Sequence, residues 1–244
     1  MGPPGYAGGA REWAPPGYGV GEDVRMSERA GDVADTADQR REQMLRAAIE
    51  VIEERGFPET RIADVAARAG TSPALVIYYF KTKDQLLTEA LRYSEDQWYE
   101  AGLERLEVIA TAVGRLTELI AMTCLPDTDP GTTAGKPTEW LLWLDLWALS
   151  PRNPGVAAVR RKFDERWRQT IETTVLTGQE AGEFSSTVDA REFAVSLSAL
   201  LDGMAVQIAL EDPDVPPARA YDLAMRYASG QLGFTWQQGS QIRR

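Results

Sequence analysis

Residues 60–87 of this chain read TRIADVAARAGTSPALVIYYFKTKDQLL, and this stretch predicts three helix starts close together. A first short helix follows Thr60, a good N-cap, and ends at Gly70, where the missing Cβ permits a tight turn. Ser72 caps a second helix, and Thr82 with Gln85 forms the capping box of a third. Two short helices joined by such a turn are typical of a helix-turn-helix, whose second helix enters the major groove of DNA.

Together with the amphipathic helix that precedes it, this stretch resembles the DNA-binding domain of TetR-family transcriptional regulators. The usual glycine after Ser-x is Ala74 here, and the tyrosine that contacts a phosphate in many members is Ile77. The resemblance implies a helix-turn-helix over residues 61–80, within a DNA-binding domain of residues 39–92 that binds a double-stranded operator. It covers residues 40–90 and is carried by Thr60, Val65-Ala66, Ala69-Gly70, Ser72, Tyr79-Phe80, Lys83-Asp84 and Leu86.

The first turn of the recognition helix is expected to face the bases. Its side chains are small or apolar, so contacts to thymine methyl groups and readout of DNA shape are expected to dominate. Tyr78 and Lys83 are candidates for phosphate contacts, and at least one of Tyr78 and Tyr79 is expected to pack against the first helix. The predicted DNA-binding residues are Thr60, Arg61, Thr71, Ser72, Pro73, Ala74, Leu75, Tyr78, Tyr79 and Lys83.

The net charge of −11 is unusual for a DNA-binding protein, but it is unevenly distributed. Residues 40–92 hold nine Lys or Arg against eight Asp or Glu, whereas residues 1–39 hold three against seven and residues 93–244 hold fourteen against twenty-two. DNA binding needs a local positive surface more than a positive total. The basic residues beside the predicted recognition helix could form that surface or be ordinary solvated charges; they are Arg61, Arg68, Lys81 and Lys83.

Composition argues against several other classes of protein. The chain contains no histidine and a single cysteine, Cys124, so it lacks the commonest general base, the commonest zinc ligand and any internal disulfide. We expect no enzyme activity, no metal site and no cofactor. No apolar run is long enough to cross a bilayer and no secretory signal is present, so we expect a cytoplasmic protein without a membrane partner.

The remaining sequence predicts helices and no strands, so the expected fold is all-α with about nine helices. Residues 1–38 are rich in Gly, Pro and acidic residues and are expected to form a disordered extension. Residues 93–236 are expected to form a larger helical ligand-binding and dimerisation domain, followed by a flexible tail at 237–244. Helices are expected from Lys83 toward Glu107 and over 115–125, 138–149, 154–181, 189–212 and from Pro217 toward Phe234.

Three tryptophans, Trp140, Trp143 and Trp147, share one face of the helix predicted at 138–149. Such a row is often simple core packing, but it can also line a ligand cavity and hold a cation against its rings. Asp145, on the opposite side of this helix, and Asp202 are acids on apolar helices and need an arginine, solvent or a ligand as partner. These five residues and Met204 are the predicted ligand-binding residues.

The TetR resemblance implies a homodimer in which the last long helices of each subunit pair, and Phe193, Leu197 and Leu201 are the predicted interface. The segment WLLWLDLWALSPRNP also resembles the subgroup of choline-responsive repressors. The leading hypothesis is a repressor released from a palindromic operator by a small-molecule effector, with a cationic amine as the favoured class. The alternative is an effector-independent DNA-binding architectural or cell-cycle protein on the same fold.

Overall fold

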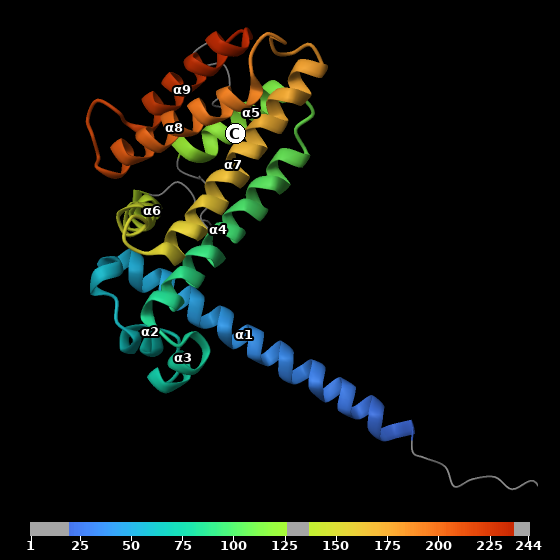
Figure 1. Ribbon diagram of the computed structural model, residues 1–244, viewed down its shortest axis with the longest axis vertical. Coiled ribbons are helices and arrows are strands. Elements are labelled where there is room, and N and C mark those ends of the chain that lie inside the picture. The colour runs from blue at the N-terminus through green and yellow to red at the C-terminus, as the bar shows by residue number, and fades with distance from the viewer. Residues whose placement is uncertain (1–19, 126–136, 237–244) are drawn as a thin grey trace, which may run out of the picture. The chain divides into compact units, whose positions relative to one another are not determined.

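The computed structural model describes the backbone of residues 20–125 and 137–236, and the side chains of residues 37–125 and 140–236 (Figure 1). The residues so described form nine α-helices and no strand, which confirms the all-α prediction. Internal contacts divide the chain into residues 1–41 and 42–244, and the second unit contains every site considered below. The helices are α1 Val20–Glu59, α2 Ile62–Arg68, α3 Pro73–Phe80, α4 Lys83–Glu107, α5 Ala112–Cys124, α6 Pro137–Leu149, α7 Pro154–Glu180, α8 Ala190–Ala209 and α9 Pro217–Leu232.

Helix α1 begins at Val20, inside the segment 1–38 for which the sequence predicted no regular structure. No proline lies between Pro16 and Pro58, so nothing in this part of the chain forces a helix to end. Near its C-terminal end the helix is interrupted at Gly56, whose φ of 76° is favourable only for glycine. Residues 1–19 and the predicted tail 237–244 lie outside the described residues.

The predicted N-caps of α3 and α4 are confirmed, whereas the predicted N-cap of α2 is not. Ser72 accepts a hydrogen bond from the Leu75 N–H and Thr82 accepts one from the Gln85 N–H. The N-cap of α2 is Arg61, one residue later than predicted, and its side chain makes no capping bond. Thr60 is 1% exposed and donates its hydroxyl to the Gly56 carbonyl at 2.8 Å, so its side chain supports the end of α1 instead.

The helix-turn-helix owes its rigidity to a small core of its own. Phe80 and Val76 of α3, Val65 of α2 and Ala48 of α1 are all fully buried in this cluster. Each large apolar side chain buried in this way stabilises the fold by about 1.5–3 kcal/mol. The start of α4 joins the same cluster through Leu86, which fixes the helix-turn-helix to the helix that enters the C-terminal part of the chain.

The C-terminal core is formed mainly by α5, α7, α8 and α9. Phe193, Leu197 and Leu201 lie in this core and are 3%, 0% and 1% exposed, so the prediction that they form the dimer interface is wrong. Helical spacing identified the apolar face of α8 correctly, but that face is covered by the chain's own helices. Among the described residues α8 alone is long and apolar enough to cross a membrane, and its buried face marks it as a core helix.

Cys124 ends α5 and is 2% exposed within the C-terminal core. Burial disfavours the thiolate and raises the pKa of this thiol to about 12. Because a thiol reacts through its thiolate, Cys124 is chemically inert in the folded protein.

Candidate functional site

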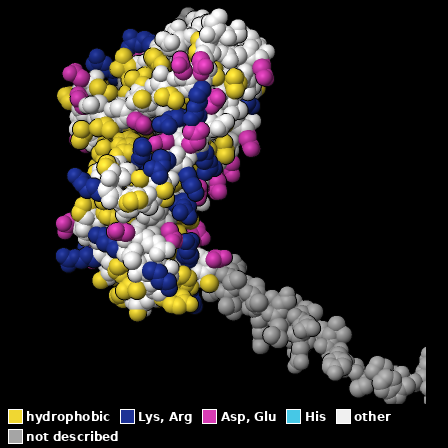
Figure 2. All heavy atoms as spheres, viewed as in Figure 1, with side chains coloured by type: hydrophobic (Ala, Val, Ile, Leu, Met, Phe, Trp, Pro, Cys, Tyr) yellow, Lys and Arg dark blue, Asp and Glu magenta, His cyan; other side chains and the backbone are white. Residues whose placement is uncertain are grey.

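One face of α3 is open to solvent and carries most of the residues predicted to contact DNA. Ser72, Pro73 and Ala74 are exposed at the start of the helix, and Tyr78 is 68% exposed one turn further on. Ile77 is 50% exposed on the same face and was not among the predicted contacts. Figure 2 shows hydrophobic side chains beside Lys and Arg side chains over the region of α2 and α3.

Four other predicted contacts are partly or wholly withdrawn from this face. Leu75 and Tyr79 are half-buried and pack against the helix-turn-helix core, which agrees with the expectation that one of the two tyrosines packs inward. Thr71, in the turn, is half-buried as well. With the Thr60 side chain buried, direct contact from this set is left mainly to Ser72, Pro73, Ala74 and Tyr78.

The basic residues beside α3 differ in how far their charge is already compensated. Arg68 forms ion pairs with Glu50 at 2.9 Å and Glu54 at 2.7 Å, so its charge is neutralised by α1. Arg61 is exposed and forms no ion pair with a described residue. Lys81 donates to the Tyr78 carbonyl at 2.6 Å. Arg61 is therefore the better candidate for a phosphate contact, although both arginines lie on the same short helix-turn-helix.

Lys83 starts α4 and reaches back to the end of α1. Its ammonium group donates to the Pro58 carbonyl at 2.9 Å and lies 5.4 Å from the centre of the Phe57 ring. The side chain is half-exposed, so it can meet a phosphate only while also serving this internal contact. The predicted role as a phosphate anchor remains a prediction.

The tryptophans of α6 divide between two environments. Trp140 packs against the C-terminal core, near which Met204 is buried. Trp143 lies 6.1 Å from Trp147 and 6.0 Å from Phe163 of α7, measured between ring centres. Trp143 and Trp147 are thus in ring contact beside α7, whereas Trp140 packs against a different cluster.

Asp145 has a structural partner that the sequence did not suggest. Its carboxylate accepts a hydrogen bond from the backbone N–H of Phe57 at 2.8 Å, where α1 is interrupted after Gly56. The carboxylate therefore has a hydrogen-bond partner without an arginine or a ligand cation. We therefore remove Asp145 from the candidate ligand residues.

Asp202 and Met204 cannot line one pocket as predicted, because residues two apart on a helix point in nearly opposite directions. Met204 is 8% exposed in the core, whereas Asp202 is exposed. Although the Asp202 carboxyl reaches solvent, the protein atoms around it reduce its hydration, and with the charge of Asp164 this raises its pKa to about 6. Asp202 forms no hydrogen bond or ion pair with a described residue.

A buried acid that sequence analysis missed, Glu95, lies on the inner face of α4. It is 6% exposed and forms no hydrogen bond or ion pair with any residue whose side chain is described. One turn further along, Trp98 lies 5.5 Å from Trp167 of α7 between ring centres. The signal that could have found it is helical spacing, because Leu91, Glu95, Tyr99 and Gly102 recur on one otherwise apolar face.

On α7, Asp164 precedes Trp167 by three residues, just as Glu95 precedes Trp98 on α4. It pairs with Arg160 at 2.7 Å and lies 3.9 Å from Arg168. Its negative charge raises the pKa of Glu95 as well as that of Asp202. Glu95 and Asp164 are therefore close enough to interact between α4 and α7, and each lies three residues before one member of the Trp98–Trp167 pair.

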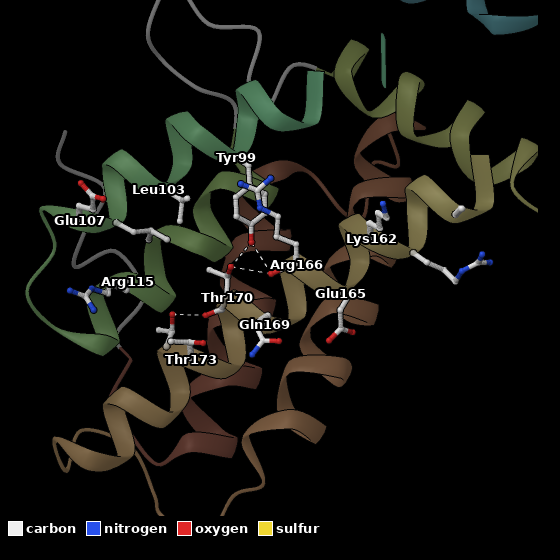
Figure 3. A pocket seen from close by; sticks show the side chains of 14 residues that line it. Tyr99, Leu103, Glu107, Arg115, Lys162, Glu165, Arg166, Gln169, Thr170 and Thr173 are labelled. Carbon is white, nitrogen blue, oxygen red and sulfur yellow. Dashed lines mark hydrogen bonds between the residues drawn. The ribbon is translucent and has the colours of Figure 1, made fainter. Parts of the chain in front are cut away.

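A groove of about 1010 Å³ lies between α4 and α7 and reaches α5 (Figure 3). Tyr99 lines this groove, and its hydroxyl donates a hydrogen bond to the Arg166 carbonyl and shares one with the Thr170 hydroxyl. The Arg166 guanidinium covers the Tyr99 ring at 3.7 Å and pairs with Asp96 at 3.1 Å. Its basic lining residues, Arg115, Arg161, Lys162 and Arg166, outnumber the acidic ones, Glu107 and Glu165, so this groove is poorly suited to a cation.

Both the N-terminal and the C-terminal part of the chain match known protein families. Residues 44–90 match the family model of bacterial regulatory proteins of the tetR family, and residues 120–233 match the C-terminal model of BetI-type transcriptional repressors. The chain therefore belongs to the TetR family of transcriptional regulators, which bind DNA and are not enzymes. The described residues contain no group of acids and cysteine that could hold a metal ion.

Individual relatives point to the BetI type. The chain is 28% identical over 193 residues to the HTH-type transcriptional regulator BetI of Proteus mirabilis, covering 79% of this chain and 92% of that regulator. It is 30% identical over 192 residues to BetI of Burkholderia mallei, covering 77% and 91%. A transcriptional regulator from Saccharomonospora viridis, solved in complex with choline, is 32% identical with a TM-score of 0.71, covering 80% of this chain and 98% of that one.

Proposed function

We propose that this protein is a cytoplasmic, homodimeric repressor that a cationic amine, such as a quaternary ammonium compound, releases from a palindromic operator. The observation that carries the effector class is the position of Glu95 and Asp164 beside the Trp98–Trp167 pair. Carboxylates and aromatic faces are the two groups that attract an alkylated ammonium ion once water is excluded. The choline complex of the Saccharomonospora viridis regulator supports the same class of ligand.

The proposed effector site lies between α4, α6 and α7. It differs from the sequence prediction in its acids, because Asp145 is held by Phe57 and Asp202 lies on the exposed side of α8. It retains Trp143 and Trp147, which reach it through the contact of Trp143 with Phe163. Each of the three helices thus contributes at least one aromatic ring.

The proposed dimer uses the outward face of α8 in place of the buried residues named above. Val195 is 43% exposed, and Leu210, just beyond the helix, is 65% exposed. Between them Ala199 and Gly203 are exposed, and a Cβ built on Gly203 would meet no atom within 4 Å. Small residues on an exposed apolar stripe allow a second helix to approach closely.

Effector and DNA are coupled in this proposal through the spacing of the two recognition helices. Half-sites one helical turn apart require helices about 34–36 Å apart, so a modest movement of α4 in each subunit suffices for release. The effector must bind the released conformation more tightly than the DNA-bound one, because a ligand with equal affinity for both conformations does not shift the equilibrium between them.

The test uses the full chain and the DNA upstream of its own gene. Fluorescence anisotropy should show binding to a palindrome in that DNA, and choline or a related quaternary amine should weaken it. A panel of neutral and anionic metabolites of similar size is the control. Release by anionic or neutral compounds alone would refute the cationic effector, and DNA binding insensitive to every compound would favour the effector-independent alternative.

A further inference from the structure

We propose that Glu95 selects a positively charged effector by placing its carboxylate against the cationic group, deep between α4 and α7. This inference rests on the proposed function and goes further, because it assigns charge selection to one residue. Glu95 is 6% exposed and forms no hydrogen bond or ion pair with a described residue. Burying a charged group without a partner is strongly unfavourable, so an acid at this position lowers the stability of the folded protein.

Neighbouring acids are already occupied by arginines, and this distinguishes Glu95 from them. Asp96 pairs with Arg166, which in turn lies over the Tyr99 ring. Asp164 is held by Arg160 and lies near Arg168. Glu95 is therefore the acid of this group that remains available to a ligand.

The rings next to Glu95 complete a site for an alkylated cation. Trp98 follows Glu95 by three residues and Trp167 follows Asp164 by three, so each acid and its tryptophan share a helix face. The two indoles lie 5.5 Å apart between centres. Methyl groups of a quaternary amine can pack on these rings while the carboxylate compensates the charge, whereas a neutral molecule of the same shape gains only the packing.

Effector binding should then release a proton. Burial raises the pKa of Glu95 to about 8; Arg166 opposes this shift, and Asp96 and Asp164 add to it. In the free protein at pH 7 the carboxyl is therefore mostly protonated and neutral. A cation favours the ionised form, so its affinity should rise with pH up to about 8 and level off above it.

The decisive experiment titrates the full-length protein by isothermal calorimetry with choline chloride and with 3,3-dimethylbutan-1-ol, its neutral isostere. For the unmodified protein the affinity for choline should rise roughly 20-fold from pH 6.5 to 8.5, while that for the alcohol stays constant. At pH 7, buffers of different ionisation enthalpy should report release of about 0.9 proton per choline bound. Glu95→Gln should lose at least tenfold in choline affinity at pH 8.5, together with the pH dependence, and should bind the alcohol unchanged.

Two controls separate a ligand contact from a structural role. Glu100→Gln makes the same chemical change on the exposed side of α4 and should behave like the unmodified protein. Because a buried acid with a raised pKa disfavours the folded state as pH rises, Glu95→Gln should melt at a higher temperature than the unmodified protein at pH 8.5. Weaker choline binding by a more stable protein is the expected combination.

The outcomes distinguish this inference from the proposed function. If choline binds Glu95→Gln as tightly as the unmodified protein, with the same pH dependence, Glu95 is not the selecting residue although the cationic effector stands. If no cation binds and only neutral or anionic compounds release DNA, both proposals fail. Should Glu95→Gln not fold, Glu95→Asp supplies the test: it keeps the acid but withdraws it by one methylene, so choline affinity should fall while its dependence on pH persists.

Discussion

The Asp145 carboxylate and the Phe57 backbone N–H, 88 residues apart in sequence, are joined by a 2.8 Å hydrogen bond. Asp145 belongs to α6, which carries Trp143 and Trp147, and Phe57 lies at the end of α1 beside Lys83. The bond therefore connects the helix that bears part of the proposed effector site with α1, which packs against the helix-turn-helix. Movement of α6 on ligand binding would be passed to α1 through this bond and through the apolar cluster that Ile52 and Phe57 share with α6.

Removing this contact should weaken both stability and coupling. Hydrogen bonds to charged groups contribute about 1.5–3 kcal/mol, so Asp145→Ala should lower the free energy of unfolding by an amount near the lower end of that range. Asp145→Asn keeps an acceptor oxygen and should lose less. Urea denaturation measures stability, and anisotropy with and without choline measures coupling. If choline released DNA from Asp145→Ala fully, and at the same concentrations as from the unmodified protein, the contact would not take part in coupling effector binding to DNA binding.

The two arginines of the helix-turn-helix should differ in their effect on DNA binding. Arg61→Ala should reduce the slope of log affinity against log salt by about 0.9, the value expected for one lost phosphate contact. Arg68→Ala should leave that slope nearly unchanged, because Glu50 and Glu54 already neutralise Arg68. Titrations at several salt concentrations decide the matter. Equal slopes for the two variants would mean that Arg61 does not contact a phosphate.

A matched pair of substitutions on α8 locates the dimer interface. Val195→Glu places a charge on the exposed face and should give a folded monomer, because the charge must be desolvated only on association. Leu197→Glu places the same charge in the core and should cost several kcal/mol of stability, preventing folding. Sedimentation velocity and circular dichroism provide the two measurements. A stable dimer of Val195→Glu would move the interface to another face.

Gly178 of α7 should tolerate no side chain. A Cβ there would lie 2.1 Å from Cδ2 of Phe184, a ring that is 4% exposed, and 2.8 Å from the Cβ of Ala112. Gly178→Ala should therefore destabilise the protein by about 1–3 kcal/mol through overpacking. Gly230→Ala, in α9 with no atom within 4 Å, should instead raise stability by up to about 1 kcal/mol through helix propensity. Thermal melts measure both effects. Equal changes in melting temperature for the two variants would show that packing at Gly178 is unimportant.

Local sequence signals predicted local structure well and long-range partners poorly. Ser72 and Thr82 were recognisable as caps because a cap bonds to a backbone N–H three residues away. Spacing also identified the apolar face of α8, but periodicity cannot tell whether Leu197 is buried by its own chain or by a second copy. The partner of Asp145 is a backbone group on another helix, and Glu95 becomes buried only when α7 packs on α4. Both depend on tertiary packing that no short window of sequence contains.

Cys124 gives the protein a built-in reporter of its own opening. It is the single cysteine of the chain, and the buried, protonated thiol reacts only when α5 separates from the core. The rate of labelling by a thiol reagent, read by mass spectrometry, therefore counts opening events without an engineered probe. A ligand that stabilises the C-terminal helices would slow that labelling, so the thiol can rank candidate effectors before any operator is known.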